Sequence, residues 1–381
     1  MEYDCGASSP AFGVVWNMRI EELEEFIAAS FCRAHCVVAG SGTSAIYLAL
    51  RALGLRGKSV LIPSVLCPSP LYAVIASGMK PRFVDVQLES FGLDLDDVRR
   101  RATPECKVLL AVHPFGYSLP REPLRQLAEQ FGLLLVEDAA QGGWWLPPAP
   151  GSVTILSFGW EKPLSAGKGF RRANSGQSNA ETPCWGGAVL TDDERFAREV
   201  RLLRDREPTV HMLTAGRCAG AVFGMPGPQM WWKPVRTFAL DSVAEGLRRW
   251  PENMEARCRI AAVYERLLSH PLIRKPPSPP GPLWRYSVLL PGRFVRNRVL
   301  VRLVKLGVPA WRMYPPLHIR WGYLEGESRS LLLPNSQEIG DRILNLIIEP
   351  GMTDSDAVSF AEALLSALCD PTVFTEREDG V

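Results

Sequence analysis

The sequence predicts an α/β protein with a mostly parallel sheet in its larger N-terminal part and a smaller α+β domain at its C-terminal end. Two observations predict it. Short apolar runs alternate with helical stretches over the first half of the chain, as in βαβ units whose strands are buried on both faces. After about residue 190 the alternation stops, and the proline-rich connector "RKPPSPPGPLW" precedes a mixture of strands and helices.

The elements of the larger part follow from the spacing of apolar residues. A first amphipathic helix is expected over residues 16–31, where apolar side chains recur at helical spacing. The strands expected after it are, in order, "CVVAG", "SVLIP", "PRFVDV", "KVLLAVHPFG", "LLLVEDAA", "SVTILSFG" and "GGAVLTDD". Helical stretches separate most of these strands, which is the connection that parallel neighbours require.

The C-terminal part is expected to begin with one long helix, running through "FALDSVAEGLRRW" into "ENMEARCRIAAVYERLLSH". The strand "WRYSVLLPG" and the helices "NRVLVRLVKLG" and "SDAVSFAEALLSALC" follow it. We therefore expect two domains, a large one over residues 1–235 and a small one over residues 236–381.

Composition excludes several classes of protein. The chain has 381 residues, and its 43 basic and 41 acidic residues give a net charge of +2, so neither nucleic acid nor an anionic membrane is an expected partner. The N-terminal sequence has no signal-peptide pattern, and no apolar run is long enough to cross a membrane. Nine cysteines, an odd number, favour reduced thiols in the cytoplasm. The stretch "CRAHC" lacks a second ligand pair, so no metal site is expected.

The stretch "AGSGTSA", residues 39–45, lies between an expected strand and an expected helix. It fits a dinucleotide fingerprint, but no acidic residue occurs between Ala45 and Asp85 to bind a ribose. A dinucleotide oxidoreductase is therefore a distant alternative. The helix N-terminus at Gly42, Thr43 and Ser44 still suits an anion such as phosphate, or is simply a helix cap.

Two further stretches place charged groups at strand ends. In "LLLVEDAAQGG" a buried strand ends at Asp138, where a carboxylate needs a cation such as the protonated ring nitrogen of pyridoxal phosphate; a helix cap is the alternative. In "SFGWEKPLSAGKG" Lys162 follows another strand and is a candidate Schiff-base lysine, with the Ser157 hydroxyl available to phosphate. Most loop lysines are only solvated charges. Together, a phosphate cup, an acid and a lysine at three successive strand ends match one cofactor, pyridoxal phosphate.

These stretches resemble the DegT/DnrJ/EryC1/StrS family of pyridoxal-phosphate-dependent aminotransferases, which act mainly on nucleotide-linked keto sugars. The resemblance covers most of the chain, and its motifs are "SGTSAIYLALRALGL", "VHPFG", "VEDAAQ", "SFGWEKPLSAGKG" and the segment that begins "YPPLHIRWGY". It implies the aspartate-aminotransferase fold, known as fold type I, with a seven-stranded, mostly parallel sheet in the large domain. It also implies a homodimer with active sites at the subunit interface.

The resemblance implies roles for individual residues. Lys162 would be the Schiff-base lysine and proton carrier, Asp138 the partner of the pyridinium nitrogen, and Gln141 a neighbour of the cofactor's phenolic oxygen. The implied phosphate site consists of Gly42, Thr43, Ser44 and Ser157. The implied reaction is a ping-pong transfer from an amino donor, with glutamate expected, to a keto sugar. Related dehydratases carry histidine in place of this lysine, so a lysine at position 162 favours transamination.

Departures from the family pattern gather on the substrate side. Cys67 stands where relatives carry an aromatic residue that stacks on the cofactor, residues 168–186 are an insertion, and the family's Gly-Tyr-Asn motif is not recognisable. Tyr314 and His318 in "YPPLHIRW" are candidate substrate residues. The alternatives are a catalytically weakened member with a regulatory or scaffold role, and a pyridoxal-phosphate enzyme that acts on a ketone other than a sugar.

Two sets of residues stay open between a functional and a structural role. His113 in "VHPFG" suits a structural hydrogen bond as well as a catalytic role. Four tryptophans are candidates for a substrate or dimer surface, although single aromatics are more often core: Trp144, Trp145, Trp231 and Trp232.

Overall fold

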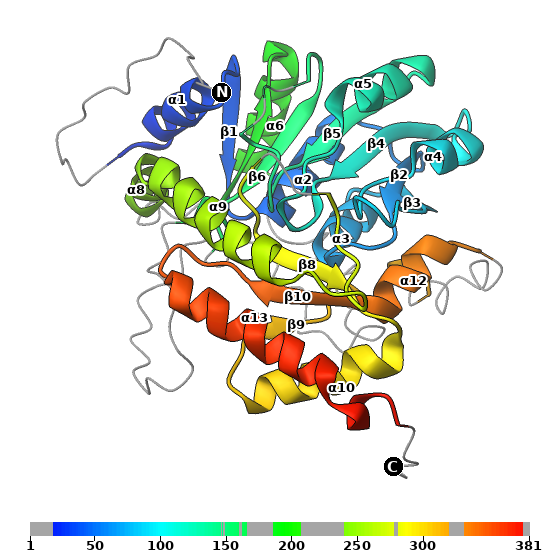
Figure 1. The fold of residues 1–381 in the computed structure, drawn as a ribbon. Coiled ribbons are helices and arrows are strands. Elements are labelled where there is room, and N and C mark those ends of the chain that lie inside the picture. The colour runs from blue at the N-terminus through cyan, green and yellow to red at the C-terminus, as the bar shows by residue number, and fades with distance from the viewer. Residues whose placement is uncertain are drawn as a thin grey trace.

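The computed structural model describes residues 18–145, 147, 149–159, 162–165, 186–206, 240–277, 281–319 and 331–375. The N-terminal part of the chain forms a seven-stranded sheet and the C-terminal part forms a separate three-stranded sheet. The two sheets lie in different parts of the molecule (Figure 1). The strands of the large sheet are β1 (His35–Ala39), β2 (Ser59–Pro63), β3 (Lys80–Val84), β4 (Cys106–Val112), β5 (Leu134–Asp138), β6 (Val153–Ser157) and β7 (Gly187–Thr191). The fold class predicted from the sequence is confirmed.

The strands of the large sheet lie in the order β1-β7-β6-β5-β4-β2-β3. Four neighbouring pairs are parallel, and β7 is antiparallel to both of its neighbours. The sheet is therefore mostly parallel, as predicted, and every strand except β7 runs in one direction. The carboxyl ends of those strands meet at one edge, which is where open α/β sheets place their ligands.

Side chains of the large sheet alternate between two apolar layers. In β4, Val108 and Leu110 face the layer that contains α2 (Gly42–Ala52), α3 (Pro68–Ala76) and α6 (Glu194–Arg206). Leu109 and Ala111 face the layer that contains α4 (Leu95–Arg101) and α5 (Arg121–Gln130), and α1 (Ile20–Ser30) and α8 (Leu240–Arg248) continue this layer over β1 and β7. Because both faces are covered, the strands have the continuous apolar character that the sequence showed.

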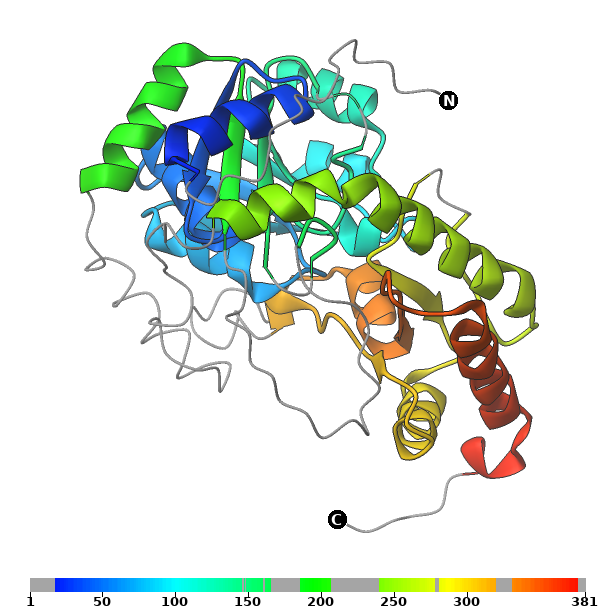
Figure 2. The same cartoon turned by 90° about the vertical axis from the view of Figure 1, so that its left-hand side faces the viewer.

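The long helix expected in the C-terminal part is two helices. Helix α8 ends at Arg248, and α9 (Trp250–Leu267) begins after Arg249, whose φ of −90° and ψ of 0° are not helical. Pro251 lies in the first turn of α9, where its missing N–H is tolerated, whereas inside one continuous helix it would remove a hydrogen bond. The first helix begins at Ile20, later than residue 16, with Arg19 as its N-cap. Helix α9 runs alongside both parts of the molecule (Figures 1 and 2).

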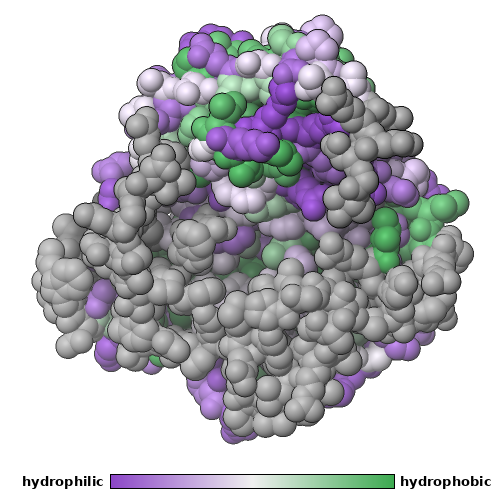
Figure 3. Space-filling model, turned by 90° about the horizontal axis from the view of Figure 1, so that it is seen from below, coloured by the Kyte–Doolittle hydropathy of each residue, from purple (hydrophilic) through white to green (hydrophobic). Residues whose placement is uncertain are grey.

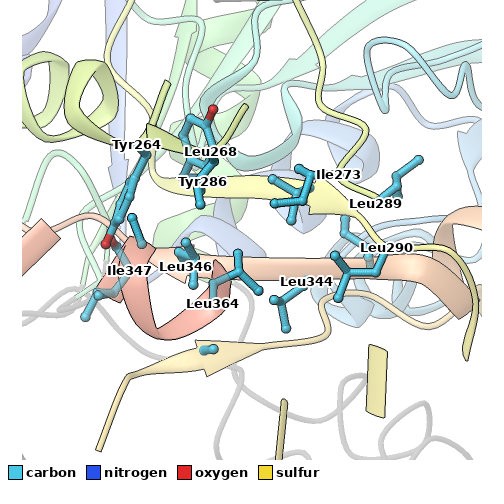
Figure 4. Packing of buried hydrophobic residues seen from close by; sticks show 14 of the residues in the cluster. Tyr264, Leu268, Ile273, Tyr286, Leu289, Leu290, Leu344, Leu346, Ile347 and Leu364 are labelled. Atoms are coloured by element: carbon cyan, nitrogen blue, oxygen red, sulfur yellow. The ribbon is translucent and has the colours of Figure 1, made fainter. Parts of the chain in front are cut away.

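The three-stranded sheet has β10 (Ile343–Ile347) between β8 (Arg285–Leu289) and β9 (Ala310–Trp311), antiparallel to both. One face is apolar and packs against α9 and α13 (Asp354–Cys369), with the rings of Tyr264 and Tyr286 5.3 Å apart (Figure 4). The opposite face is mixed, with the buried polar side chains of Arg285, Ser287 and Asn345 among apolar ones, and Asn345 Nδ2 donates to Ser287 Oγ across it at 2.9 Å. Helices α10 (Arg293–Lys305) and α12 (Pro334–Arg342) complete this part.

The division at residue 235 stays a prediction, because residues 207–239 lie outside the described part of the chain. Within that part, none of the helices has the length and apolar character needed to cross a membrane, and no cluster of three or more candidate metal ligands occurs. From "CRAHC", Cys36 is buried in β1, as its apolar surroundings predicted. Seen from below, hydrophilic and hydrophobic residues lie side by side on the described surface (Figure 3).

Candidate active site

The N-terminus of α2 lies against the end of β6. Ser41 caps the helix by accepting a hydrogen bond from the backbone N–H of Ser44 at 3.1 Å. A Cβ added at Gly42 would lie 2.9 Å from Cβ of Ser157 and 3.2 Å from its hydroxyl oxygen, so only glycine permits this approach. Thr43 and Ser44 are buried beside it. The first-turn N–H groups of the helix and the Ser157 hydroxyl thus share one small region, which suits a phosphate.

Asp138 ends β5 at the same edge of the sheet and is 5% exposed. Its Oδ1 accepts a hydrogen bond from the backbone N–H of Ala140 at 3.0 Å; Oδ2 has no hydrogen bond to any described residue. Burial raises the pKa of Asp138, against the lowering effects of the Ala140 N–H and of the positive charge of Lys162. A buried carboxylate with one oxygen available fits a cationic partner such as a protonated ring nitrogen.

Lys162 lies in a tight turn after β6. Its backbone N–H donates to the carbonyl of Gly159 at 2.8 Å, and the N–H of Ser165 donates to the Lys162 carbonyl at 3.0 Å. The side chain extends toward the C-terminal part, where Nζ lies 4.4 Å from the centroid of the Trp284 ring. An ammonium over an indole face is an attractive cation–π contact. Trp284 immediately precedes β8, so the two sheets both contribute to the surroundings of the lysine.

Three aromatic rings form a second group beside the lysine. The Phe115 ring is nearly parallel to the rings of Trp284 and Tyr314, at centroid distances of 6.5 and 5.8 Å. Gln141 bonds to two of these three residues, since its Oε1 accepts from the Phe115 N–H at 2.8 Å and its Nε2 donates to the Tyr314 hydroxyl at 3.4 Å. Gly116 has a φ of +98°, and a Cβ there would lie 2.7 Å from the backbone nitrogen of Trp284. The glycine of "VHPFG" is therefore required for this contact.

A buried polar network lies behind Asp138 and is centred on Glu137, which is fully buried. Glu137 accepts hydrogen bonds from Arg121 Nε at 2.7 Å, from His113 Nε2 at 3.1 Å and from the Ser152 hydroxyl at 3.1 Å. Burial alone would raise the pKa of Glu137, but His113 and Arg121 outweigh it and hold the pKa at about 2. Because His113 Nδ1 accepts from the Leu119 N–H at 3.1 Å, both ring nitrogens are engaged and His113 has a structural role.

The candidate substrate residue His318 connects the two parts of the molecule. Its Nδ1 is 2.6 Å from the hydroxyl oxygen of Ser64, which also accepts the His318 backbone N–H at 3.2 Å. One hydroxyl thus holds both the ring and the backbone of His318. Burial lowers the pKa of His318 to about 4, so the imidazole is neutral at neutral pH. Cys67 is the N-cap of α3, and its thiol contacts the Ser69 hydroxyl at 3.4 Å.

The structure thus brings predicted site residues together in three places: Gly42 lies by Ser157, the charge of Lys162 acts on Asp138, and Gln141 contacts Tyr314. Cys67 and His318 contact Ser69 and Ser64 instead, and neither has a described contact with these pairs. For Trp144 and Trp145, which the sequence left open between a surface and a core role, the structure favours the core. Both are buried, 5.0 Å apart, in the layer beside α1 and α8, because the turn after β5 folds back against those helices. Trp231, Trp232, the insertion at residues 168–186 and the region of the missing Gly-Tyr-Asn motif lie outside the described residues.

The family model of the DegT/DnrJ/EryC1/StrS aminotransferase family matches residues 15–169 and 181–365. The chain belongs to this family. The resemblance stated from the motifs is confirmed, and with it the class of enzyme, an aminotransferase.

Two relatives in the DegT/DnrJ/EryC1/StrS family act on sugars according to their names. GDP-perosamine synthase from Caulobacter vibrioides is 27% identical over 360 residues, covering 88% of this chain and 86% of the relative. The dTDP-3-amino-3,4,6-trideoxy-alpha-D-glucose transaminase of Streptomyces venezuelae is 29% identical over 361 residues, covering 90% of this chain and 86% of the relative. Both names agree with the sugar aminotransferase predicted from the sequence.

Solved structures confirm the fold. DesV from S. venezuelae, determined in complex with a ketimine intermediate, has a TM-score of 0.73 and 27% identity, covering 91% of this chain and 88% of DesV. NtdA from Bacillus subtilis, determined with bound PMP, has a TM-score of 0.72 and 22% identity, covering 92% of this chain and 77% of NtdA. The fold of pyridoxal-phosphate aminotransferases, expected from the motifs, is therefore the fold of this family member.

Proposed function

We propose that the protein is a pyridoxal-phosphate-dependent aminotransferase that moves an amino group from an amino acid, with glutamate as the expected donor, to a nucleotide-linked keto sugar. The observation that carries the proposal is the convergence of Asp138, Lys162 and the N-terminus of α2 at one edge of the sheet. The names of two relatives, which act on GDP- and dTDP-linked sugars, support the substrate class.

The residues present fit the cofactor. Gly42, Thr43 and Ser44 at the helix N-terminus, with the Ser157 hydroxyl, would hold its phosphate. The buried Asp138 would pair with its ring nitrogen through the oxygen that no described residue engages. When bound, the cofactor supplies an electron sink for the carbon that gains or loses nitrogen.

The chain itself supplies binding, orientation and proton movement. Lys162 would attach the resting cofactor covalently and, once displaced by the amino donor, would carry a proton from one carbon to another through Nζ. Gln141 is held by Phe115 and Tyr314, so its amide would be fixed beside the cofactor's phenolic oxygen. Cys67 is proposed to lie against the cofactor, and Tyr314 and His318 near the substrate. The neutral imidazole of His318 is tied to Ser64, which favours a positioning role over that of a base.

Two further features belong to this proposal. The protein would act as a homodimer, as the family resemblance implies. It would work in the cytoplasm, which agrees with the free thiols of Cys36, Cys67, Cys106, Cys258 and Cys369. Size-exclusion chromatography with light scattering tests the first of these, and cell fractionation tests the second.

The deciding experiment is the visible absorption spectrum of the purified protein before and after glutamate is added. A cofactor band that glutamate converts, and that a nucleotide-linked keto sugar restores, is the expected result. Conversion restored only by ketones without a sugar would favour the non-sugar enzyme. A protein that takes up no pyridoxal phosphate would overturn the enzyme and favour a regulatory or scaffold role.

A further inference from the structure

Arg285 is a buried cation next to the proposed site. It is the first residue of β8 and is 2% exposed. Its guanidinium carbon lies 4.6 Å from the centroid of the Trp284 ring and 4.9 Å from that of the Trp311 ring. Contact with two indoles holds the planar group in place and excludes water from it. The side chain is therefore ordered before any ligand arrives.

The hydrogen bonds of Arg285 leave one edge of its guanidinium unused. Nη1 donates to the Trp284 carbonyl at 3.2 Å and to Glu349 Oε1 at 3.0 Å. Nε is buried and has no partner, and Nη2 has no hydrogen bond to any described residue. The edge formed by Nε and Nη2 is the one that can bind a carboxylate through two parallel hydrogen bonds. A buried donor without an acceptor is unfavourable, so a ligand that supplies one would bind with a corresponding gain.

The charges around Arg285 are not balanced by the described residues. Glu349 Oε1 pairs with Arg285 at 3.0 Å, and Glu349 Oε2 lies 3.5 Å from Nη2 of Arg257, which is 1% exposed. One carboxylate thus faces two buried guanidinium groups, and it is the only carboxylate among the described residues that forms an ion pair with either. The surplus of positive charge favours an anionic ligand.

The Arg285 guanidinium contacts the same indole ring as the proposed reacting group. Lys162 Nζ lies 4.4 Å from the centroid of the same Trp284 ring that Arg285 contacts. The two cationic groups therefore cannot be farther apart than the sum of those two distances. An anion bound at Arg285 would therefore lie in the same region as the carbon on which Lys162 is proposed to act.

We propose that the Nε–Nη2 edge of Arg285 binds the α-carboxylate of the amino donor. The inference rests on the proposed aminotransferase function. In an amino acid the α-carboxylate is bonded directly to the reacting carbon, which agrees with the contact of Arg285 and Lys162 with one indole ring. The phosphates of a nucleotide-linked sugar are separated from the reacting carbon by the sugar ring and the glycosidic oxygen. A planar carboxylate also matches a fixed guanidinium edge in shape.

The test compares Arg285→Gln, Arg285→Lys and the wild-type holoenzyme in the first half-reaction, followed through the visible band of the bound cofactor. The donors are glutamate and isoglutamine, in which the α-carboxylate is a neutral amide. With glutamate, the Gln variant should lose about 10- to 100-fold in kcat/KM, and the Lys variant, which keeps the charge but not the paired donors, should lose less. With isoglutamine, wild type and variants should be equally slow. Arg298→Gln, at an arginine that contacts Phe294 on α10, is the matched control and should behave as wild type.

Binding gives a second measurement that needs no turnover. Isothermal titration of the holoenzyme with glutarate, a dicarboxylate without an amine, should show weaker binding to Arg285→Gln than to wild type. Cofactor absorption and melting temperature establish that each variant is folded, and if the Gln variant does not fold, the Lys variant decides. An unchanged rate with glutamate, an equal loss with isoglutamine, or a loss confined to the half-reaction with the keto sugar would overturn the proposal. The last result would place phosphate at this edge. Wild type that reacts with no amino donor would instead overturn the proposed function itself.

Discussion

The buried carboxylate of Glu137 allows a quantitative prediction. It accepts hydrogen bonds from His113, Arg121 and Ser152 and is fully shielded from solvent. Glu137→Gln keeps the shape of the side chain but removes the charge that Arg121 faces. It also replaces an acceptor oxygen with an NH₂ group, which cannot accept a hydrogen bond from these donors. We therefore expect a clear loss of stability in a position that touches no proposed substrate or cofactor.

The size of the loss follows from the pKa of Glu137. Its ordinary value is 4.5, and in the folded protein His113 and Arg121 outweigh burial and lower it to about 2. A difference of this size corresponds to about 3 kcal/mol of folding free energy, at the lower end of what breaking a buried ion pair costs. For a chain of 381 residues, an unfolding entropy of about 2 cal/mol/K per residue converts this to a melting temperature about 4 °C lower.

The same pKa fixes the direction of the pH dependence. A carboxyl group whose pKa is depressed by folding contributes its stability fully above its unfolded pKa, here about 4.5, and loses it as the pH falls toward the folded value of about 2. Wild type should therefore lose more stability than Glu137→Gln over that interval.

The assay is thermal unfolding of the cofactor-free protein at several pH values, so that ligand binding does not contribute. Glu105→Gln is the matched control, since Glu105 pairs with Lys58 at the surface and should change little. Equal melting temperatures for wild type and Glu137→Gln at neutral pH would refute the reasoning.

The remaining predictions concern the proposed site and its connections. Lys162→Ala should abolish conversion of the cofactor's visible band by glutamate, and a variant that still converts it would exclude Lys162 from amino transfer. Asp138→Asn should slow turnover about 10- to 100-fold, because a charge-assisted hydrogen bond worth roughly 1.5–3 kcal/mol is lost; an unchanged kcat would contradict its pairing with the ring nitrogen. Gly42→Ala should weaken cofactor binding about tenfold or more, because the added carbon would meet the end of β6 at 2.9 Å. Gly292→Ala is the control, because a carbon added there meets nothing within 4 Å, and it should leave cofactor binding unchanged. Equal cofactor affinities for the two variants would count against the phosphate site. Folding lowers the pKa of His318 from 6.5 to about 4, so wild type should lose stability as the pH falls through that interval and His318→Asn should lose less; parallel melting curves at pH values near 7 and 5 would disprove it.

The positions of the candidate residues could be predicted because each depends on local pattern. Asp138, Ser157 and Gly42 lie at the ends of elements that periodicity identifies, and parallel strands bring their carboxyl ends to one edge without further information. The fold follows for the same reason. The break between α8 and α9 also had a local signal, Pro251, which the apolar spacing on both sides obscured.

Contacts between the two parts could not be predicted in this way. Lys162 meets Trp284, and Trp284 donates its backbone N–H to the Phe115 carbonyl at 2.8 Å, although these residues are far apart in the sequence. In "WRYSVLL" the alternation shows a strand but not that the polar side chains of Arg285 and Ser287 are buried. Buried polar side chains have no periodic signature, because the partners they contact are brought near only by the tertiary fold.

The structure also bears on the distant alternative of a dinucleotide enzyme, which the spacing of the glycines in "AGSGTSA" left open. Asp85 is the first acidic residue after the glycine-containing turn, and a ribose would need its carboxylate to be available. Both of its oxygens are already engaged at the start of α12: Oδ1 accepts from the Ser336 N–H and hydroxyl at 2.7 Å each, and Oδ2 accepts from the Asn335 N–H at 3.1 Å. The carboxylate thus caps a helix of the C-terminal part and fixes it against the large sheet. The residue that a fingerprint would assign to a nucleotide instead joins the two parts, between which Lys162 and Arg285 face the same indole ring.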